Sequence, residues 1–562
     1  MSGLRPRSTK CLLVQPPFSP QSFWNYAEVC RLVGARYPAA PLGLMTVAAL
    51  LPQQWAFRLI DENVKPLSNA DLDWGDIVCT GGMLPQQQAI LRLIDHAHAK
   101  GRPVVVGGAD PKSQPGLYQA ADFLVLGEGE VTIPLFLEDL AKGVTSGIYC
   151  SSERADMTRA VAPRFDLIRF ADYLQVGIQF SRGCPFNCEF CDITELFGRK
   201  PRCKTPHQIL TELQALYDLG YRGLVDLVDD NFIGNRPQVI ELLQAMQAWS
   251  ERHHYPFCFS TEASINLAGD EQLLRLLQHN DFRFVFLGIE SPDDEVLAEA
   301  QKGQNRGVSV VKAVRTLAAY GLVVNGGFIL GFDHETEHTA RNMIHLIQES
   351  GIVMAMVGGL YALAGTRLSR RLSREGRLFA CSTIVTDGPS DIDQTTSGLN
   401  FATVRPRGDI LEDQARVLEH IYDPRQYYER VLRTATQLRP AGRHRPRLSE
   451  LPGLARSFWR VCRKVGLGRG TARLYWQTLF QVLVRNPKAV DVAVNLAAMY
   501  IHFARQSEFA VRMLRERAAT IRRCDEEAYN ARMVAGRAGE VDQAVESPKL
   551  ISGQTDSRVR SM

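Results

Sequence analysis

The sequence predicts an α/β protein in which two consecutive strand–helix series are followed by an all-helical region. Three observations predict this fold class. Short β-rich runs alternate with helical segments up to about residue 145, the same alternation recurs between residues 175 and 400, and only helical periodicity follows. A composition of 45% hydrophobic and 22% charged residues over 562 residues is typical of a globular protein with several domains.

The first series, residues 8–145, is typical of a doubly wound parallel sheet of the Rossmann type. We expect its strands at 10–18, 57–63, 76–83, 103–110 and 123–130. Ligands of such sheets bind beyond the carboxyl ends of the strands. There the sequence places residues that let backbone approach a bulky ligand, namely Gly81, Gly82, Gly107, Gly108 and Gly127, followed by Glu128. Tight turns between strand and helix also use glycine, so these glycines alone are weak evidence for a ligand.

Residues 146–174 are expected to connect this sheet to the second series, residues 175–400. Six strand–helix repeats there predict a partial (β/α)6 barrel of the TIM type, with strands at 176–181, 223–229, 257–265, 282–291, 323–332 and 353–360. Active sites of such barrels lie at the carboxyl ends of the strands. A cysteine motif follows the first of these strands and the Asp229-Asp230 pair ends the second, so both are expected at the site.

Residues 401–538 are expected to form a helical C-terminal domain, with helices at 412–420, 426–437, 458–465, 471–485, 489–504 and 508–523. The polar tail 539–562 is expected to be disordered. Between Arg425 and Arg473 the chain carries thirteen Lys or Arg and two Glu. Such a basic block suits nucleic acid, anionic lipid or an anionic ligand, or is a solvated connector. The aromatic residues of this region are either helix core or an apolar cap over a substrate: Phe458, Trp459, Tyr475, Trp476, Phe480, Tyr500 and Phe503.

Cysteine usage and the N-terminus both predict a cytoplasmic protein. The 12 cysteines are scattered without a dense framework, which favours a reducing compartment over secretion. The polar, basic N-terminus does not read as a signal peptide, and no apolar stretch is long enough to predict a membrane span. The basic block allows a peripheral contact with the inner membrane, which we state as a hypothesis.

The most informative residues are Cys184, Cys188 and Cys191, spaced C-x3-C-x2-C. Three thiolates at this spacing bind three irons of a [4Fe–4S] cluster and leave the fourth iron open to a small molecule. Zinc is the alternative, but a structural zinc site closes with four ligands. No second Cys-x2-Cys or paired-histidine motif lies nearby, and Cys203 is a stray candidate for a fourth ligand. The sequence therefore favours the cluster.

This cysteine spacing, with Phe190 directly before the last cysteine, resembles the signature of the radical S-adenosylmethionine (SAM) enzymes. The resemblance implies a [4Fe–4S] cluster and SAM as cofactors, and an electron donor such as flavodoxin or ferredoxin. It also implies cofactor-binding residues at successive strand ends: Asp229 and Asp230 for the methionyl amine, Glu262 at the same mouth, Glu290 near the ribose, and Gly327, Ile329 and Gly331 on the adenine side. The acid expected after Gly331 is displaced, because Glu335 falls one position late. Each carboxylate alone is as well explained by a salt-bridged barrel rim.

The first series resembles the cobalamin-binding domain that is fused to many radical SAM enzymes. It lacks the Asp-x-His-x-x-Gly motif that gives cobalt a histidine, and the corresponding loop reads Gly81-Gly82-Met83-Leu84-Pro85-Gln86. The resemblance implies that one SAM methylates cob(I)alamin and a second SAM yields the radical that removes hydrogen from an unactivated carbon. Methylcobalamin then delivers the methyl group to that carbon.

Residues 59–64, 188–193, 197–202 and 228–235 resemble the subgroup that contains hopanoid C-2 methylases and bacteriochlorophyllide C-8 and C-12 methyltransferases. This implies a C-methyltransferase acting on an apolar polycyclic or tetrapyrrole substrate, with a hopanoid-like lipid favoured and no nucleic acid as partner. Residues 21–37 differ from the subgroup, and Ala364-Gly365-Thr366 replaces its Pro-Gly-Thr. The alternatives are a cyclase of the anaerobic magnesium-protoporphyrin ester type and a non-catalytic iron–sulfur sensor. Methylthiotransferases need a second cysteine set, and none is clustered here.

Overall fold

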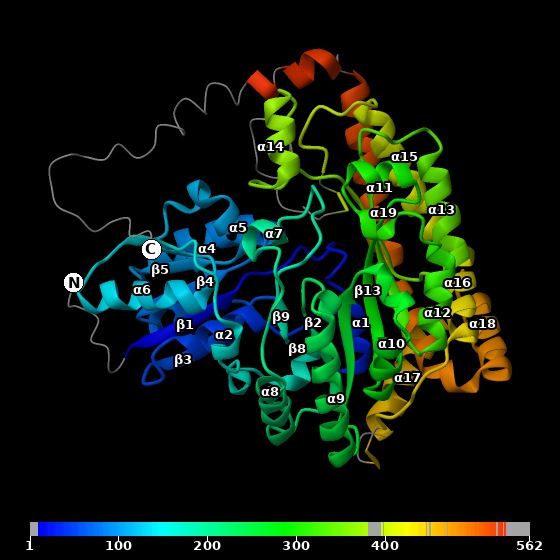
Figure 1. The fold of residues 1–562 in the computed structure, drawn as a ribbon, viewed down its shortest axis with the longest axis horizontal. Helices are drawn as coiled ribbons and strands as arrows, with labels where there is room; N and C mark the ends of the chain where they lie inside the picture. Colours follow the sequence, from blue (N-terminus) through cyan, green and yellow to red (C-terminus); the bar gives the residue numbers. More distant parts are fainter. Residues whose placement is uncertain are drawn as a thin grey trace.

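Two parallel β-sheets organise the chain, and helices that connect the strands cover them (Figure 1). The computed structural model describes residues 9–379, 395–396, 398–445, 447–448, 451–468, 470–523, 526–531 and 533–535. The tail predicted for 539–562 lies outside the described residues. The predicted fold class, a Rossmann-like sheet followed by a partial barrel and then by helices, is confirmed.

The N-terminal sheet has six parallel strands in the order β3-β1-β4-β5-β6-β7. They are β1 (Lys10–Gln15), β3 (Ala56–Asp61), β4 (Ile77–Gly81), β5 (Val104–Gly107), β6 (Phe123–Leu126) and β7 (Gly147–Cys150). The first five are the predicted strands. The sixth, β7, pairs with β6 inside the segment expected to be a connector. Its four residues, with a single buried side chain, are too short a pattern to predict a strand from sequence.

Each face of the N-terminal sheet has its own core, because successive side chains of a strand point to opposite faces. Cys11 and Leu13 of β1 lie in one core, and Leu12 and Val14 lie in the other. The helices that complete these cores are α2 (Leu42–Leu50) and α6 (Gly129–Ala141) on the first face, and α3 (Asn69–Trp74) and α4 (Gln87–Ala99) on the second. Burial on both faces explains why the centre of β1 is continuously apolar.

The barrel sheet has seven parallel strands in the order β15-β14-β13-β12-β11-β8-β2. The six predicted strands are β8 (Tyr173–Ile178), β11 (Gly223–Leu227), β12 (Phe257–Ala263), β13 (Phe282–Glu290), β14 (Val323–Leu330) and β15 (Ala355–Gly359). The connecting helices include α8 (Pro206–Asp218), α9 (Arg236–Arg252), α10 (Glu271–His279), α12 (Val310–Ala319) and α13 (Thr339–Ser350). The seventh strand, β2 (Tyr37–Ala39), pairs with β8. Residues 37–39, predicted to belong to the first series, lie in the barrel sheet.

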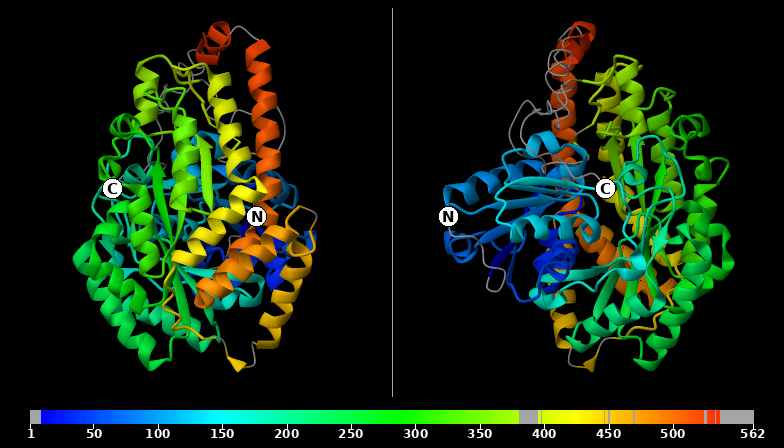
Figure 2. Two further views of the ribbon diagram at one scale, coloured as in Figure 1. Left: turned by 90° about the vertical axis from the view of Figure 1, so that its right-hand side faces the viewer. Right: turned by 60° about the vertical axis from the view of Figure 1, so that its left-hand side comes forward.

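The C-terminal region packs its helices along the barrel, as the two views in Figure 2 show. Its helices are α14 (Arg367–Arg374), α15 (Arg407–Ile421), α16 (Pro424–Gln437), α17 (Leu451–Val465), α18 (Ala472–Arg485) and α19 (Val490–Arg523). The helices predicted at 489–504 and 508–523 form one helix, α19, because residues 505–507 contain no glycine or proline to end it. None of the helices described here combines the length and apolarity needed to cross a bilayer.

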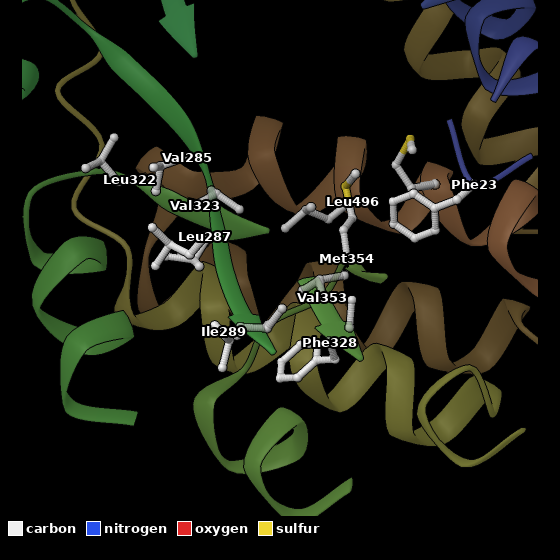
Figure 3. Close-up of a cluster of buried hydrophobic side chains, with 14 of the residues drawn as sticks. Phe23, Val285, Leu287, Ile289, Leu322, Val323, Phe328, Val353, Met354 and Leu496 are labelled. Atoms are coloured by element: carbon white, nitrogen blue, oxygen red, sulfur yellow. The ribbon is translucent and has the colours of Figure 1, made fainter. Parts of the chain in front are cut away.

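The barrel, α19 and the segment before the first helix share one hydrophobic core. Figure 3 shows Val285, Leu287 and Ile289 of β13 in this core, with Leu496 of α19 and Phe23 nearby. The Phe23 ring lies 4.9 Å from that of Phe503, also on α19. The N-terminal segment is therefore attached to the barrel and to α19, although it precedes most of the first sheet in sequence.

Candidate active site

The cysteine loop leaves the carboxyl end of β8 and returns through a short antiparallel pair, β9 (Ser181–Arg182) with β10 (Arg202–Cys203). Backbone hydrogen bonds fix the loop at its base and its middle. The Cys184 amide donates to the carbonyl of Gly198 at 3.2 Å, and the Glu189 amide donates to the carbonyl of Ala300 at 3.0 Å. The loop is therefore held against the barrel mouth on both sides of the three cysteines.

The structure brings Cys184, Cys188 and Cys191 together at this mouth, close enough for the charge of one thiolate to affect another. Burial raises the pKa of the Cys184 and Cys191 thiols, so their thiolates need cationic partners. No three His, Cys, Asp or Glu side chains converge on a single-ion site in the described part of the chain. A [4Fe–4S] cluster does not require such convergence, because each thiolate binds a different iron. Three thiolates suit three irons of a [4Fe–4S] cluster, whereas a structural zinc site takes four ligands.

Cys203, the candidate for a fourth ligand, is buried on β10, where it pairs with Ser181 across the base of the loop.

Polar side chains approach two of the three motif cysteines. Asn231 Nδ2 lies 3.9 Å from the Cys184 sulfur, and Gln304 Nε2 lies 3.8 Å from the Cys188 sulfur.

A buried ion pair between Glu290 and Lys302 lies beside the three thiols, and sequence reasoning found only its acidic member. The Lys302 ammonium is 2.6 Å from Glu290 Oε1 and 5.9 Å from the centre of the Phe190 ring. Burial opposes its charge, but Glu290 and the nearby Cys188 thiolate outweigh burial and raise the pKa of Lys302. Glu290 sits at a φ of 67°, a conformation that non-glycine residues rarely adopt and that is common at functional sites. No motif spacing in the sequence marks Lys302.

Four carboxyl groups line the barrel at the ends of β11 and β12: Asp226, Asp229, Asp230 and Glu262. Burial raises the pKa of Asp229 to about 7 and that of Asp230 to about 6. Burial, and then the charges of the three aspartates, raise the pKa of Glu262 well above its usual value. A cationic ligand in this lumen would relieve both the burial and the mutual repulsion.

The two adjacent aspartates differ in what they contact. Asp229 is fully buried and accepts hydrogen bonds from the backbone of Phe180 and from the amide and hydroxyl of Ser181, so it holds the start of the cysteine loop. Asp230 is only half-buried, and its Oδ2 accepts from the Gly183 amide at 2.7 Å. Of the pair, Asp230 is therefore the better placed to meet a ligand in the lumen.

The predicted adenine-side residues lie on and just after β14. A side chain at Gly327 would meet the Phe286 ring at 3.1 Å, while Ile329 is half-buried. Gly331 has a φ of 116°, and its amide donates to Glu335 at 2.8 Å. The displaced Glu335 is thus a buried acceptor for this turn, and burial raises its pKa to about 8.

The wall formed by β13 to β15 is more apolar than the carboxyl-lined wall. Phe286 and Ile329 alternate with the fully buried core residues of their strands, so they point to the opposite side, into the lumen. Trp24, from the segment before α1 (Ala27–Val33), contacts Phe286 with 5.7 Å between ring centres and the two ring planes tilted by 50°. The N-terminal segment therefore contributes an aromatic side chain to the barrel.

The predicted glycines of the N-terminal sheet lie at its carboxyl edge, but close backbone contacts account for most of them. A Cβ at Gly81 would be 2.4 Å from the Gly107 carbonyl oxygen, and one at Gly108 would be 2.7 Å from the Gly82 nitrogen. Gly127, at a φ of 109°, differs because a Cβ there would meet nothing within 4 Å. Of the five, Gly127 is the one that leaves open space for a ligand.

Glu128 joins the N-terminal sheet to the cysteine loop. Its buried carboxylate is 3.1 Å from Arg182 Nη1 and 2.9 Å from Arg202 Nη2, and Glu130 lies 2.9 Å from Arg182 Nη2. Arg182 lies in β9 and Arg202 in β10, and the two residues pair at the base of the cysteine loop. Sequence reasoning placed Glu128 at the sheet edge but did not find its arginine partners, which are more than 50 residues away.

Comparisons with known proteins find similar families, relatives and solved structures. A model of the radical SAM superfamily matches residues 178–347, and a domain of unknown function, DUF4070, matches residues 366–516. An uncharacterized methyltransferase of Synechocystis is 38% identical over 98% of this chain and 100% of its own length. The hopanoid C-2 methylase of Rhodopseudomonas palustris is 37% identical over 67% of this chain and 72% of its own length.

Among solved structures, the cobalamin-dependent SAM radical enzyme OxsB, with aqua-cobalamin and SAM bound, superposes with a TM-score of 0.56. The match covers 95% of this chain and 84% of OxsB at 15% identity, which shows a shared fold. The radical SAM model covers the cysteine motif and four of the barrel's seven strands, β11 to β14, and the relatives above are by name a methyltransferase and a methylase. The family's cofactors are a [4Fe–4S] cluster and SAM. The chain therefore belongs to the radical SAM superfamily, in which it is a methyltransferase.

Proposed function

We propose that this enzyme uses cobalamin to methylate an unactivated carbon of an apolar polycyclic molecule, with a hopanoid-like lipid favoured over a tetrapyrrole. The observation that carries the proposal is the two-sided lumen. Carboxyl groups on β11 and β12 suit a cationic cofactor, whereas Trp24, Phe286 and Ile329 offer an apolar wall to the acceptor. The 37% identity with a hopanoid C-2 methylase favours the lipid acceptor.

The charged groups at the mouth complement the two charges of a methionyl group. Asp230 would accept hydrogen bonds from its amine, and Lys302 would face its carboxylate. Glu290, held at its unusual φ beside Lys302, would lie near the ribose. When bound, the cluster supplies the electron that cleaves SAM. The protein residues bind and orient SAM and exclude water from the lumen.

Cobalamin would bind between the carboxyl edge of the N-terminal sheet and the barrel. At the end of β6, a Cβ at Gly127 would meet nothing within 4 Å. A separate cavity of about 580 Å³ lies at the carboxyl ends of β1 and β3 and is also lined by residues of α1 and α19. The loop after β4, residues 82–86, contains no histidine, so that loop offers cobalt no imidazole ligand. When bound, cobalamin supplies the methyl group that is transferred.

We also infer that the electron donor, an acidic carrier such as flavodoxin or ferredoxin, docks at α14. Four of its eight residues are arginines, and it borders a cavity of about 900 Å³ that includes Glu189 of the cysteine loop. Arg371 binds Glu189 at 2.8 Å, which attaches the helix to the loop. Arg367 and Arg374 have no carboxylate partner among the described residues. Their hydrogen bonds go to uncharged acceptors, so their positive charges are not neutralised by a carboxylate and can attract acidic groups of a partner.

Reduction kinetics test this docking site. Arg367→Glu with Arg374→Glu should slow cluster reduction by flavodoxin about tenfold or more at low salt, and leave reduction by dithionite unchanged. The matched control carries Arg456→Glu and Arg460→Glu on α17, a different helix, and changes the net charge of the protein by the same amount. Equal flavodoxin rates for the two double variants would contradict the assignment.

The reaction itself is tested anaerobically with SAM, dithionite, cobalamin and a hopanoid acceptor. The proposal expects 5′-deoxyadenosine and S-adenosylhomocysteine together, and a product heavier by one methylene. Deuterated methyl-SAM should transfer label to that product. The control replaces Cys184, Cys188 and Cys191 with alanine and should form neither nucleoside product. Deoxyadenosine without S-adenosylhomocysteine would instead favour a cyclase, and cobalamin-independent turnover would refute the role of cobalamin.

A further inference from the structure

Helices α17 and α18 leave large apolar side chains in solvent. Trp459 is 68% exposed and Phe458 45% exposed on α17, while Phe480 is 68% and Leu483 57% exposed on α18. The other exposed apolar residues here are Leu448, Leu451, Leu454, Leu467, Trp476 and Val484. Sequence analysis expected the aromatic residues of this region to be helix core or a substrate cap. Three of these aromatic residues are buried: Tyr475, Tyr500 and Phe503. The other four are exposed: Phe458, Trp459, Trp476 and Phe480.

The position of α17 explains why its apolar residues are exposed. In its C-terminal half, Val461, Cys462 and Val465 are buried, and the helix contacts α1 and α19. Leu454 and Phe458 precede Val461 and Cys462 by seven and four residues, so they continue the same stripe along the helix. The N-terminal half thus carries the apolar stripe beyond the part of the protein that covers it.

On α18, two adjacent faces are apolar, because the two sets of residues are offset by one position, or about 100° around the helix. Tyr475, Leu479 and Val482 are buried against the protein, whereas Trp476, Phe480 and Leu483 face solvent at spacings of four and three residues. The two helices meet at their connection, where the Trp476 indole donates to the Gly466 carbonyl at 2.9 Å. A surface helix normally carries polar residues on its outer face, so an apolar outer face indicates a further contact.

The charge of this region identifies the contact. Residues 451–488 contain eight Lys or Arg and no Asp or Glu, although acidic and basic residues nearly balance over the whole chain. On α17, Arg456, Arg460 and Arg463 flank Trp459 along a shallow groove of about 440 Å³. None of these three arginines has a carboxylate partner among the described residues. Guanidinium groups beside an exposed tryptophan suit phosphate headgroups above an apolar layer.

We propose that α17 and α18 form a surface that binds anionic phospholipid bilayers, with the helices lying in the plane of the headgroups. We call the residues Leu454, Phe458, Trp459, Phe480 and Leu483, with Arg456, Arg460 and Arg463, the bilayer surface. Amphipathic helices with basic and aromatic residues bind this way without spanning the bilayer. The absence of acidic residues over 38 positions favours an anionic bilayer over a protein partner, whose surface would carry both signs of charge.

Vesicle flotation tests the proposal with the full-length, cluster-containing protein. The vesicles contain either neutral phosphatidylcholine alone or a mixture with anionic phosphatidylglycerol, without SAM or methyl acceptor. Because each cation near an anionic bilayer contributes roughly fivefold to binding, reversing Arg456, Arg460 and Arg463 to glutamate should reduce binding by at least about a hundredfold. Replacing Leu454, Trp459, Phe480 and Leu483 with serine should also release the protein. The control, Ile148→Ser with Val404→Ser, removes two equally exposed apolar residues elsewhere and should bind normally.

A second measurement locates the contact. Brominated lipid should quench the fluorescence of wild-type protein, and Trp459→Phe should lose a large part of that quenching. Equal binding to neutral and anionic vesicles, or no binding by the wild type, would overturn the proposal. So would a dimer in lipid-free solution that the serine variant dissociates, since the surface would then be covered by a second copy of the chain. Because no acceptor is present, these outcomes are independent of the reaction proposed above.

Discussion

The Glu128 ion pairs predict how firmly the N-terminal sheet is attached to the cysteine loop. The Glu128 side chain is 1% exposed, and its partners Arg182 and Arg202 are 12% and 18% exposed. Removing one partner of a buried pair typically costs about 3–5 kcal/mol, because the remaining charge is left uncompensated. Arg182 keeps Glu130, and Arg202 keeps the carbonyls of Ala155 and Phe197. We therefore expect Glu128→Gln to lower the free energy of unfolding by about 3 kcal/mol, the lower end of that range.

The matched control is Glu138→Gln on α6. Glu138 pairs with Lys142 at 2.8 Å, but both side chains are about half exposed, and such surface pairs contribute about 0–1 kcal/mol. Anaerobic urea unfolding, followed by circular dichroism and by the visible absorbance of the cluster, measures both variants. In Glu128→Gln the cluster signal should be lost at lower urea than in wild type, because the base of its loop is released. If Glu128→Gln and Glu138→Gln unfold at the same urea concentration, the interdomain pairing does not stabilise the loop.

Three further predictions follow from buried groups. Lys302→Met should weaken SAM binding at least tenfold, measured by calorimetry. The control Lys312→Met, at an exposed lysine on α12, should leave the affinity unchanged. Equal SAM affinities of the two variants would exclude Lys302 from the site. Burial lowers the pKa of His502 from 6.5 to about 4. Between pH 6.5 and pH 4 the unfolded chain therefore binds more protons than the folded chain. The free energy of unfolding should fall by up to about 3 kcal/mol as the pH is lowered across this range. His502→Gln should flatten that dependence in urea unfolding at pH 4.5 and 7, and an unchanged slope would show that another group is responsible. Phe23→Ala should lower the free energy of unfolding by about 3–5 kcal/mol, because the Phe23 side chain is 2% exposed and its ring packs on Phe503. A loss below about 1 kcal/mol would mean that Phe23 does not anchor the N-terminal segment to α19.

Local patterns predicted the strands of both sheets except β7 and β2, and they predicted the cysteine motif, since these features depend on nearby residues. What the sequence did not predict depends on contacts between distant residues. The strand β2 is three residues long and is defined by its pairing with β8, more than 130 residues away. Lys302 gains its importance from Glu290 and the cysteine loop, and Glu128 from two arginines of another domain. The exposure of Trp459 and Phe480 likewise depends on which helix faces the rest of the protein covers, whereas their apolar character predicted either helix core or a cap over a substrate.

The arrangement separates the groups that bind the cofactors from those that would select the acceptor. Asp229 of the barrel and Glu128 of the N-terminal sheet region bind the base of the cysteine loop, and Glu189 of the loop binds Arg371 of α14. The apolar wall of the lumen receives Trp24 from a different segment, which is anchored to α19 through Phe23. Because the two segments contact different strands, substitutions in residues 21–26 would reshape the acceptor wall without moving the cysteines.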